Sequence, residues 1–409
     1  MPKILYVGID AHLKSNTVAF LDNEGNRVIP CFSLTNNLPE AEELEKRIIA
    51  CLKEQGFDGV KIATEATALL DSHLIDFLAS SPRLAPYLPE VYQLNPKLTK
   101  AFKKAYPDKD KTDVIDAQVI ADRLRFGHLP KGYQSHQPYL PLRRLCRYRY
   151  HLVEAISREK DTFLGYLFLK YSSFRSIKPF SNTFGKTSLS VISDFFSPDE
   201  LASTSLEELV SFAIEKGKNR FVDPEQIAQT LQRVGRESYR IRPALASSVN
   251  LILGSILVTI RALEKSLAEI DKAIAREFAA FPNTLKSIKG IGPVYAAGIF
   301  SEIGDIKRFK SQIQLAKFAG LTWRKRKSGN FEAEETRMTK TGNKYLRYYL
   351  IEAANSLRRH NQEYKTFYEK KYIEVPKHQH KRALALSRKE ISQIGHSFSL
   401  QRTNCINLK

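Results

Sequence analysis

The sequence has few cysteines, and their positions form no pattern. Its 409 residues contain four, at Cys31, Cys51, Cys146 and Cys405, and none forms a Cys-x-x-Cys pair. This spacing argues against a structural zinc site and against a disulfide framework. We interpret the four as isolated reduced thiols of a cytosolic protein.

Long apolar runs and targeting signals are also missing. No stretch approaches the roughly 18 consecutive apolar residues that would span a bilayer. The first eight residues, Met-Pro-Lys-Ile-Leu-Tyr-Val-Gly, lack the apolar core and the small-residue cleavage site of a signal peptide. We therefore expect a cytoplasmic protein with no membrane partner.

Negative charge is scarce, most of all toward the C-terminus. Lys and Arg number 64 against 44 Asp and Glu, which gives a formal charge of +20. From Leu321 to Lys409 there are 20 Lys and Arg, 8 Glu and no Asp. Such a surplus attracts polyanions, of which nucleic acid is the commonest, although ribosomal and membrane-surface proteins share it. The charge therefore indicates a class of partner and no chemistry.

Residues 1–130 have the pattern of an α/β domain. Apolar runs between turn signals predict strands, and periodic segments predict helices. The strands are expected at Ile4–Asp10, Thr17–Leu21, Arg27–Leu34, Val60–Thr64 and Glu90–Leu94. The helices are expected at Glu40–Glu54, Ala66–Leu78 and about Lys111–Phe126. Three antiparallel strands followed by alternating helices and strands is the order of the ribonuclease-H-like fold.

Residues 131–280 are expected to be helical. Apolar residues recur there in steps of four and three, at Val249, Leu253, Ile256, Ile260, Leu263, Leu267, Ile270 and Ile274. This spacing favours a coiled coil within or between chains, and a buried helix of a single-chain bundle is the alternative. In the less regular segment 172–240, clusters of Ser, Asn and Pro indicate loops or an inserted subdomain.

Residues 281–409 form a basic third region. It contains Lys289-Gly290-Ile291-Gly292-Pro293, which resembles the hairpin of a helix-hairpin-helix motif. Glycines in such a hairpin let backbone N–H groups approach a phosphate at a helix N-terminus. The motif is short, and a plain turn between two helices is the alternative interpretation.

Four carboxylates are the candidate metal ligands. Asp10 ends an apolar strand, Glu65 follows the strand Val60–Thr64, and Asp113 and Asp116 lie one helical turn apart on the same face. A divalent cation would offset their repulsion, and their oxygens suit Mg²⁺ or Mn²⁺. Each residue alone could instead start a turn or cap a helix. Together, in one α/β domain of a basic protein, they predict a site where two ions could hold a scissile phosphate.

Two blocks of motifs resemble the insertion-sequence 110 family of transposases, also called DEDD transposases and related to Piv-type DNA invertases. The N-terminal block consists of Gly8-Ile9-Asp10-Ala11-His12, Ala63-Thr64-Glu65-Ala66-Thr67, Asn95-Pro96 and Asp110-Lys111-Thr112-Asp113-Val114-Ile115-Asp116-Ala117. The C-terminal block consists of Ile288-Lys289-Gly290-Ile291-Gly292-Pro293, Phe318-Ala319-Gly320-Leu321-Thr322, Lys327-Ser328-Gly329, Met338-Thr339-Lys340-Thr341-Gly342-Asn343 and Leu346-Arg347. Both blocks stand in the family's order and cover about 250 residues.

The resemblance implies a RuvC-like N-terminal domain. The expected fold is therefore an α/β ribonuclease-H-like (RuvC-like) N-terminal domain, a helical coiled-coil middle and a mainly α-helical C-terminal transposase domain. It implies that Asp10, Glu65, Asp113 and Asp116 are metal ligands, and that Ser328 is the nucleophile that attacks a DNA phosphodiester. A serine hydroxyl needs its proton removed and the phosphate charge neutralised before it can attack. Bound ions could do both, and a covalent phosphoserine would keep the bond energy for resealing strands without ATP.

Family members of this kind also act with a structured non-coding RNA and as dimers or tetramers. If both properties carry over, base pairing selects the DNA sequence, and the protein recognises backbone and helix shape. The location implied is the nucleoid of a bacterium or archaeon. Expected nucleic-acid contacts are Lys289, Gly290, Gly292, Arg324, Lys325, Arg326, Lys327, Arg337, Lys340, Asn343 and Arg347.

The sequence also departs from the family. The helical middle is longer than expected, Trp323 stands where a proline is usual, and Glu332, Glu334 and Glu335 place negative charge after Ser328. Two other functions therefore stay open. One is a metal-dependent nuclease of the junction-resolvase kind with a structural Ser328, and the other is a nucleic-acid-binding protein without activity.

Overall fold

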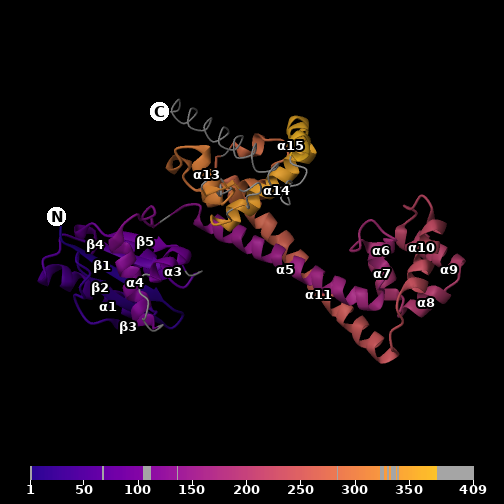
Figure 1. Cartoon of the computed structure of the whole chain (residues 1–409), viewed down its shortest axis with the longest axis horizontal. Helices are drawn as coiled ribbons and strands as arrows, with labels where there is room; N and C mark the ends of the chain where they lie inside the picture. Colours follow the sequence, from indigo (N-terminus) through magenta and orange to yellow (C-terminus); the bar gives the residue numbers. More distant parts are fainter. Residues whose placement is uncertain are drawn as a thin grey trace. The chain divides into compact units, whose positions relative to one another are not determined.

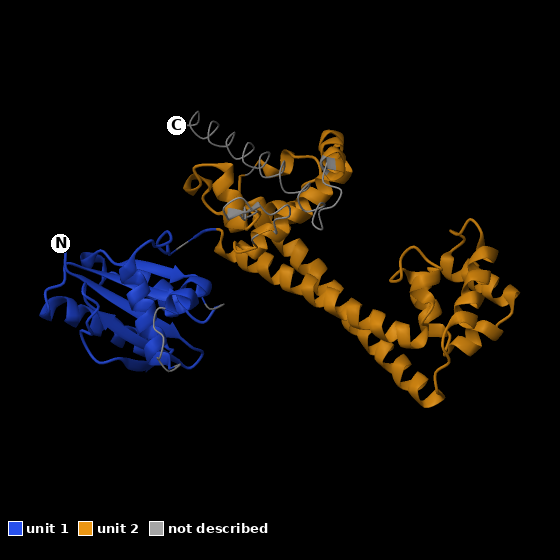
Figure 2. Ribbon diagram, in the orientation of Figure 1, with its two compact units in different colours: residues 1–138 blue, residues 139–409 orange. Residues whose placement is uncertain are grey.

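The computed structural model describes residues 2–66, 69–104, 112–135, 137–282, 284–322, 327–328, 331–332, 338 and 340–374. The chain divides into two compact units, residues 1–138 and residues 139–409 (Figure 2). Each unit contains apolar clusters of its own.

Unit 1 contains a five-stranded mixed sheet. Its strands are β1 (Ile4–Ala11), β2 (Ser15–Leu21), β3 (Phe32–Thr35), β4 (Gly59–Glu65) and β5 (Glu90–Leu94). They lie in the order β3-β2-β1-β4-β5, in which β2 is antiparallel to both β3 and β1, and β4 is parallel to both β1 and β5. All five expected strands are present, but the third is shorter than expected. Arg27 makes only an isolated bridge to Leu21, because the chain pairs with β2 again only from Phe32 onward.

Helices cover both faces of this sheet (Figure 1). They are α1 (Leu38–Glu54), α2 (Ser72–Ser80), the 3₁₀ turn η1 (Ala85–Tyr87), α3 (Pro96–Lys103) and α4 (Asp113–Phe126). Leu5, Val7 and Ile9 of β1 join a core with α1 and α2, whereas Tyr6 faces the cluster that α4 forms with β4 and β5. Because side chains alternate along a strand, Gly8 and Asp10 belong to the α4 face. Helix α2 starts later than expected, at Ser72, and residues 67 and 68 are not described.

Unit 2 is organised by two long helices, α5 (Leu140–Lys170) and α11 (Pro243–Ala279), that lie side by side (Figure 1). The ion pairs Arg149–Asp271 and Lys160–Glu264 join them in antiparallel order. Along α11, the predicted apolar residues Val249, Leu253, Ile256, Ile260 and Ile274 are buried. The expected helix is confirmed, and its classification as a coiled coil stays a prediction.

Helix α11 also has the length and apolarity of a membrane-crossing helix, with a mean hydropathy of 1.8 over its most apolar window. We expected no membrane-spanning segment because no run of consecutive apolar residues is long enough. Gly254, Ser255 and Thr259 interrupt the run without lowering the mean much. A core helix of a soluble protein passes the same test, so the property is weak support for a membrane span.

Between α5 and α11, five helices form what we call the helical subdomain, residues 172–240. They are α6 (Phe174–Ile177), α7 (Lys186–Asp194), α8 (Pro198–Ser203), α9 (Leu206–Gly217) and α10 (Pro224–Glu237). Their apolar faces share one cluster with the adjoining ends of α5 and α11. The serine-rich segment Ser197–Ser205 is largely helical, because Ser197 and Ser205 are the N-caps of α8 and α9.

The remaining helices surround a second core of unit 2. They are η2 (Leu285–Ser287), α12 (Pro293–Ile303), η3 (Ile306–Arg308), α13 (Gln312–Ala319), α14 (Lys344–His360) and α15 (Gln362–Glu374). A two-stranded ribbon, β6 (Lys327–Ser328) and β7 (Phe331–Glu332), lies between α13 and α14 in sequence. The core contains residues of α5, α11, α12, α13, α14 and α15.

Candidate active site

Two of the four carboxylates lie at the same edge of the sheet of unit 1. Strands β1 and β4 are parallel neighbours with Ile9 beside Thr64, so Asp10 and Glu65 follow side by side at the ends of the two strands. Residues two apart on a strand share a face, which places both side chains on the face that α4 covers. Both residues are half-buried.

The other two carboxylates come from the first turn of α4, Asp113 and Asp116. Thr112 caps this helix, and its hydroxyl accepts a hydrogen bond from the N–H of Ile115 at 3.3 Å. A helix N-terminus favours negative charge within its first turn. Helix α4 can lie directly on β1 because residue 8 is glycine.

The carboxylates are close enough to affect one another. Burial raises the pKa of Asp10 above its ordinary value of 3.8, and the charges of Asp116 and Asp113 raise it further while His12 opposes them. Burial likewise raises the pKa of Glu65, with further upward contributions from Asp10 and Asp116. The structure thus brings all four predicted residues into one electrostatic cluster.

Three further residues complete this cluster, and sequence reasoning assigned none of them a role. His12 Nε2 lies 3.2 Å from Asp10 Oδ2 and 3.6 Å from Asp113 Oδ1. On α3, Lys103 forms an ion pair with Asp116, and Thr99 lies near Glu65 and opposes the rise in the pKa of that carboxyl.

The sequence contained a signal for Thr99 and Lys103, because it marks where their helix begins. Asn95 and Pro96 occupy the N-cap and first position of α3, directly after β5. Residues four apart on a helix share a face, so Thr99 and Lys103 both point to the side of α3 that meets α4.

The donor set fits a divalent metal ion. One carboxylate oxygen each from Asp10 and Asp113, together with a ring nitrogen of His12, lie within 4.8 Å of one another. Carboxylate oxygens are the ligands of Mg²⁺ and Mn²⁺, and an imidazole nitrogen is tolerated better by Mn²⁺. Lys103 supplies positive charge beside Asp116, as a bound cation would.

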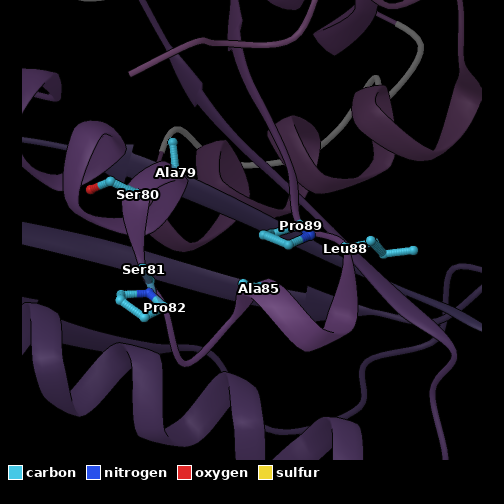
Figure 3. A pocket seen from close by; sticks show the side chains of 7 residues that line it. All are labelled: Ala79, Ser80, Ser81, Pro82, Ala85, Leu88 and Pro89. Carbon is cyan, nitrogen blue, oxygen red and sulfur yellow. The ribbon is translucent and has the colours of Figure 1, made fainter. Parts of the chain in front are cut away.

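A cavity of about 450 Å³ in unit 1 is separate from this cluster (Figure 3). Its lining includes Ser80 at the end of α2 and Pro89 just before β5. The carboxylates stand at the far ends of β1 and β4, which run parallel to β5. The cavity therefore lies toward the opposite edge of the sheet, and its lining contains no charged side chain.

The predicted nucleophile lies in unit 2, in the two-stranded ribbon. Ser328 ends β6, and its backbone pairs with that of Phe331 in β7. Of the expected contacts near it, Arg324, Lys325, Arg326 and Arg337 lie outside the described residues, and Lys327 is described for its backbone only.

The two chain segments that lead to this ribbon cross in direct backbone contact. Gly320 ends α13 with φ +69°, and a Cβ at Gly342 would lie 2.3 Å from the Gly320 N. The N–H of Asn343 donates to the carbonyl of Phe318 at 2.6 Å, and Arg347 Nη1 donates to the carbonyl of Ala319 at 3.0 Å. This crossing holds the two ends of segment 321–341 together at the core of unit 2.

Asn343 is held by buried groups. Its side-chain oxygen caps α14, and its Nδ2 donates to Glu302 Oε2 at 2.7 Å. Glu302 is 2% exposed and also accepts two hydrogen bonds from Arg147 of α5, at 2.6 and 2.9 Å. These contacts give Asn343 a structural role, and its expected contact with nucleic acid stays a prediction.

The hairpin before α12 has glycine where the backbone needs it. Gly290 has φ +106°, and a Cβ there would lie 3.2 Å from the Cα of Leu357. Gly292 is the N-cap of α12 and has no capping side chain, and Pro293 follows at the first helical position. Only a 3₁₀ turn stands directly before the hairpin, so the first helix expected of a helix-hairpin-helix is not adjacent. Lys289 is exposed.

Comparison with protein families gives two matches along the chain. Residues 7–170 match a transposase family of the DEDD, IS110 type, and residues 283–369 match the family described as Transposase IS116/IS110/IS902. The first span contains the four carboxylates, and the second contains Ser328. The helical subdomain lies between the two spans.

Individual relatives are proteins of insertion elements. A protein of insertion element IS116 from Streptomyces clavuligerus is 23% identical over 80% of this chain and 77% of its own length. A protein of insertion element IS900 from Mycobacterium paratuberculosis is 25% identical over 70% and 71%. The transposase for insertion sequence element IS1111A from Coxiella burnetii is 40% identical over 19% and 21%.

Proposed function

Because the chain belongs to the IS110 family of insertion-sequence transposases, we propose that it cuts and rejoins DNA with four carboxylates and a serine. The observation that carries the proposal is the cluster of Asp10, Glu65, Asp113 and Asp116, which three separate elements bring to one edge of the sheet. The strand order β3-β2-β1-β4-β5 supports a ribonuclease-H-like, RuvC-like assignment for unit 1.

In this proposal the four carboxylates hold Mg²⁺ or Mn²⁺. Such an ion neutralises charge on a scissile phosphate and lowers the pKa of a hydroxyl bound to it. Asp10 and Glu65 come from the ends of strands and offer a rigid half of the site. Asp113 and Asp116 close it from α4, where Lys103 pairs with Asp116 and His12 lies beside Asp113.

Ser328 is the proposed nucleophile. Its hydroxyl loses a proton and its oxygen forms a bond to a DNA phosphorus, while the bond from phosphorus to one sugar oxygen breaks. The released sugar oxygen takes up a proton. When a hydroxyl of another strand attacks the phosphoserine, the new phosphodiester forms and the serine hydroxyl is restored, so each step exchanges one phosphodiester bond for another.

The basic residues serve to bind nucleic acid in this proposal. Arg324, Lys325, Arg326, Lys327 and Arg337 surround Ser328 in sequence and would contact DNA phosphates. The proposed partners are donor and target DNA and a structured non-coding RNA from the element. The chain would act as a dimer or tetramer in the cytoplasm, with the α5–α11 pair as a coiled-coil assembly element.

The test is whether a covalent adduct forms. The full chain is incubated in Mg²⁺ with DNA carrying the element ends and with a transcript of the element's non-coding flank. We expect a denaturant-stable protein–DNA adduct that is lost in Ser328→Ala and in Asp113→Ala. Ser157→Ala, an exposed serine of α5, is the matched control and should keep it.

The second candidate function is a metal-dependent nuclease of the junction-resolvase kind. It is favoured by the carboxylate cluster, which could act with a water nucleophile and leave Ser328 without a chemical role. Cleavage at the full rate in Ser328→Ala, with no adduct in the wild type, would establish this alternative and overturn the serine mechanism.

A further inference from the structure

A cavity of about 370 Å³ lies in the helical subdomain, at the start of α7. Its lining includes Gly185, Lys186, Thr187 and Ser188, and no acidic residue. Its size is in the range of small-ligand sites. The cavity is remote in sequence from the carboxylates and from Ser328, and neither proposed catalytic element uses it.

The polar side of the cavity is the N-terminus of α7. Gly185 is the N-cap and has no side chain to cap the helix, and the first helical bond runs from Leu189 N to Gly185 O. Among the residues that the structure describes, none accepts a hydrogen bond from the N–H groups of Lys186, Thr187 and Ser188. Three free N–H groups and the helix dipole form a site for an anion.

A second, independent observation is the hydroxyl of Ser188. This side chain is 0% exposed, lines the cavity and has no hydrogen-bond partner in the described part of the chain. A buried hydroxyl is normally paired, because leaving it unpaired loses its bond to water without replacement. The neighbouring Thr187 is satisfied, since its hydroxyl donates to the carbonyl of Lys216 at 3.2 Å. A ligand oxygen in the cavity would supply the hydrogen-bond partner that the Ser188 hydroxyl lacks.

The lining of the cavity also contains aromatic side chains. Phe180 and Phe221 both line it, with ring centroids 6.0 Å apart and planes inclined by 41°. Aromatic side chains of this kind stack with nucleobases without selecting the base. The cavity thus combines an anion site with a surface for a flat ring.

From these features we propose that the cavity binds a nucleotide, with its phosphate at the N-terminus of α7 and its base against Phe180 and Phe221. Lys186 adds positive charge at the phosphate. Gly185-Lys186-Thr187 matches the end of a P-loop, but a P-loop has a glycine where this chain has Phe180 and follows a strand. The nearest elements before α7 are helices, so the site is a helix N-terminus and not a P-loop.

Calorimetric titration of the full chain tests the proposal with three probes. AMP should bind, and adenosine or inorganic phosphate alone should bind at least about tenfold more weakly. A short single-stranded oligonucleotide, with and without a 5′-phosphate, then separates the two sources of the ligand. Preference for the 5′-phosphorylated strand assigns the site to a strand end, and binding of AMP alone assigns it to a free nucleotide. Absence of binding by every phosphorylated probe would overturn the proposal.

Variants locate the binding. Lys186→Glu should weaken AMP binding by about tenfold or more, whereas Arg236→Glu on α10, with the same change of charge, should not. Ser188→Ala should also weaken binding while the melting temperature stays equal or rises, because an unpaired buried hydroxyl is removed. Equal affinity in Lys186→Glu and Arg236→Glu would refute the site. Asp113→Ala should leave AMP binding intact, so this proposal and the proposed recombinase chemistry can fail independently.

Discussion

A single methyl group at Gly8 should separate α4 from the sheet. A Cβ at this position would lie 2.2 Å from the carbonyl oxygen of Ala117 and 2.4 Å from the backbone N of Ala121. Ordinary contact begins at 3.4 Å, so the closer approach falls about 1.2 Å short. Both neighbouring atoms are backbone and cannot move aside as a flexible side chain would. In Gly8→Ala the helix itself must shift by roughly an ångström.

This shift is transmitted to the candidate active site. Asp116 directly precedes Ala117 on α4, and Asp10 lies two residues beyond Gly8 on β1. Moving α4 therefore changes the spacing between Asp116 and Asp10. Overpacking of a core costs about 1–3 kcal/mol. A displacement of about 1 Å in a catalytic constellation lowers the rate by about 10²-fold.

The assay compares Gly8→Ala with Gly59→Ala in the adjacent strand β4. At Gly59 the new Cβ would meet the flexible end of Ile4 at 3.4 Å, which is ordinary contact. We expect Gly8→Ala to lower the melting temperature, Mn²⁺ affinity and DNA cleavage together, and Gly59→Ala to preserve all three. Wild-type metal affinity and cleavage in Gly8→Ala would refute the claim that this contact sets the carboxylate geometry.

Two further predictions concern charge in the cluster. Lys103→Gln should tighten Mn²⁺ binding about two- to fivefold, because it removes a cation paired with Asp116 that is worth up to about 1 kcal/mol. Lys100→Gln on the same helix is the control, and weaker binding in Lys103→Gln would contradict this account. Because the pKa values of Asp10 and Glu65 are raised in the fold, their protonated carboxyl groups favour the metal-free folded state at low pH. This contribution to stability is lost as pH rises through the raised pKa values. Stabilisation by Mg²⁺ should therefore grow in thermal melts as pH rises above the ordinary carboxyl pKa values of 3.8 and 4.5, and Asp10→Asn should reduce that growth; a pH-independent effect of Mg²⁺ would contradict it.

The sheet of unit 1 was predictable because its signals are local. The strands alternate or run apolar between turn residues, and the candidate ligands Asp10 and Glu65 stand out because charge follows an apolar strand. His12 and Lys103 were not assigned a role, because their positions depend on how β1 and α3 meet α4 in space. Nothing in the immediate sequence of His12 distinguishes it from a surface residue, and the helix start at Asn95 and Pro96 indicates only which side of α3 carries Lys103.

The helices of the helical subdomain could not be predicted from local signals. Its serines were interpreted as loops or as part of an inserted subdomain, since Ser favours turns and helix N-caps alike. In the structure Ser197 and Ser205 begin helices whose apolar faces pack together, and such packing is a property of the whole segment. Short helices carry little periodicity, so their starts are better signals than their interiors.

The two ends of the segment that carries Ser328 are positioned by contacts between residues far apart in sequence, which no local pattern predicts. Gly320 and Gly342 each leave room for the other's backbone, across twenty-two positions of sequence, and the buried Glu302, which is paired with Arg147, holds the adjoining Asn343. A Cβ at Gly320 would lie 2.6 Å from the N of Gly342, so neither glycine can be replaced without moving the other segment. Ser328 itself is an ordinary serine in composition and spacing. Its proposed role therefore rests on the family resemblance, because the crossing fixes only where the two ends of its segment meet.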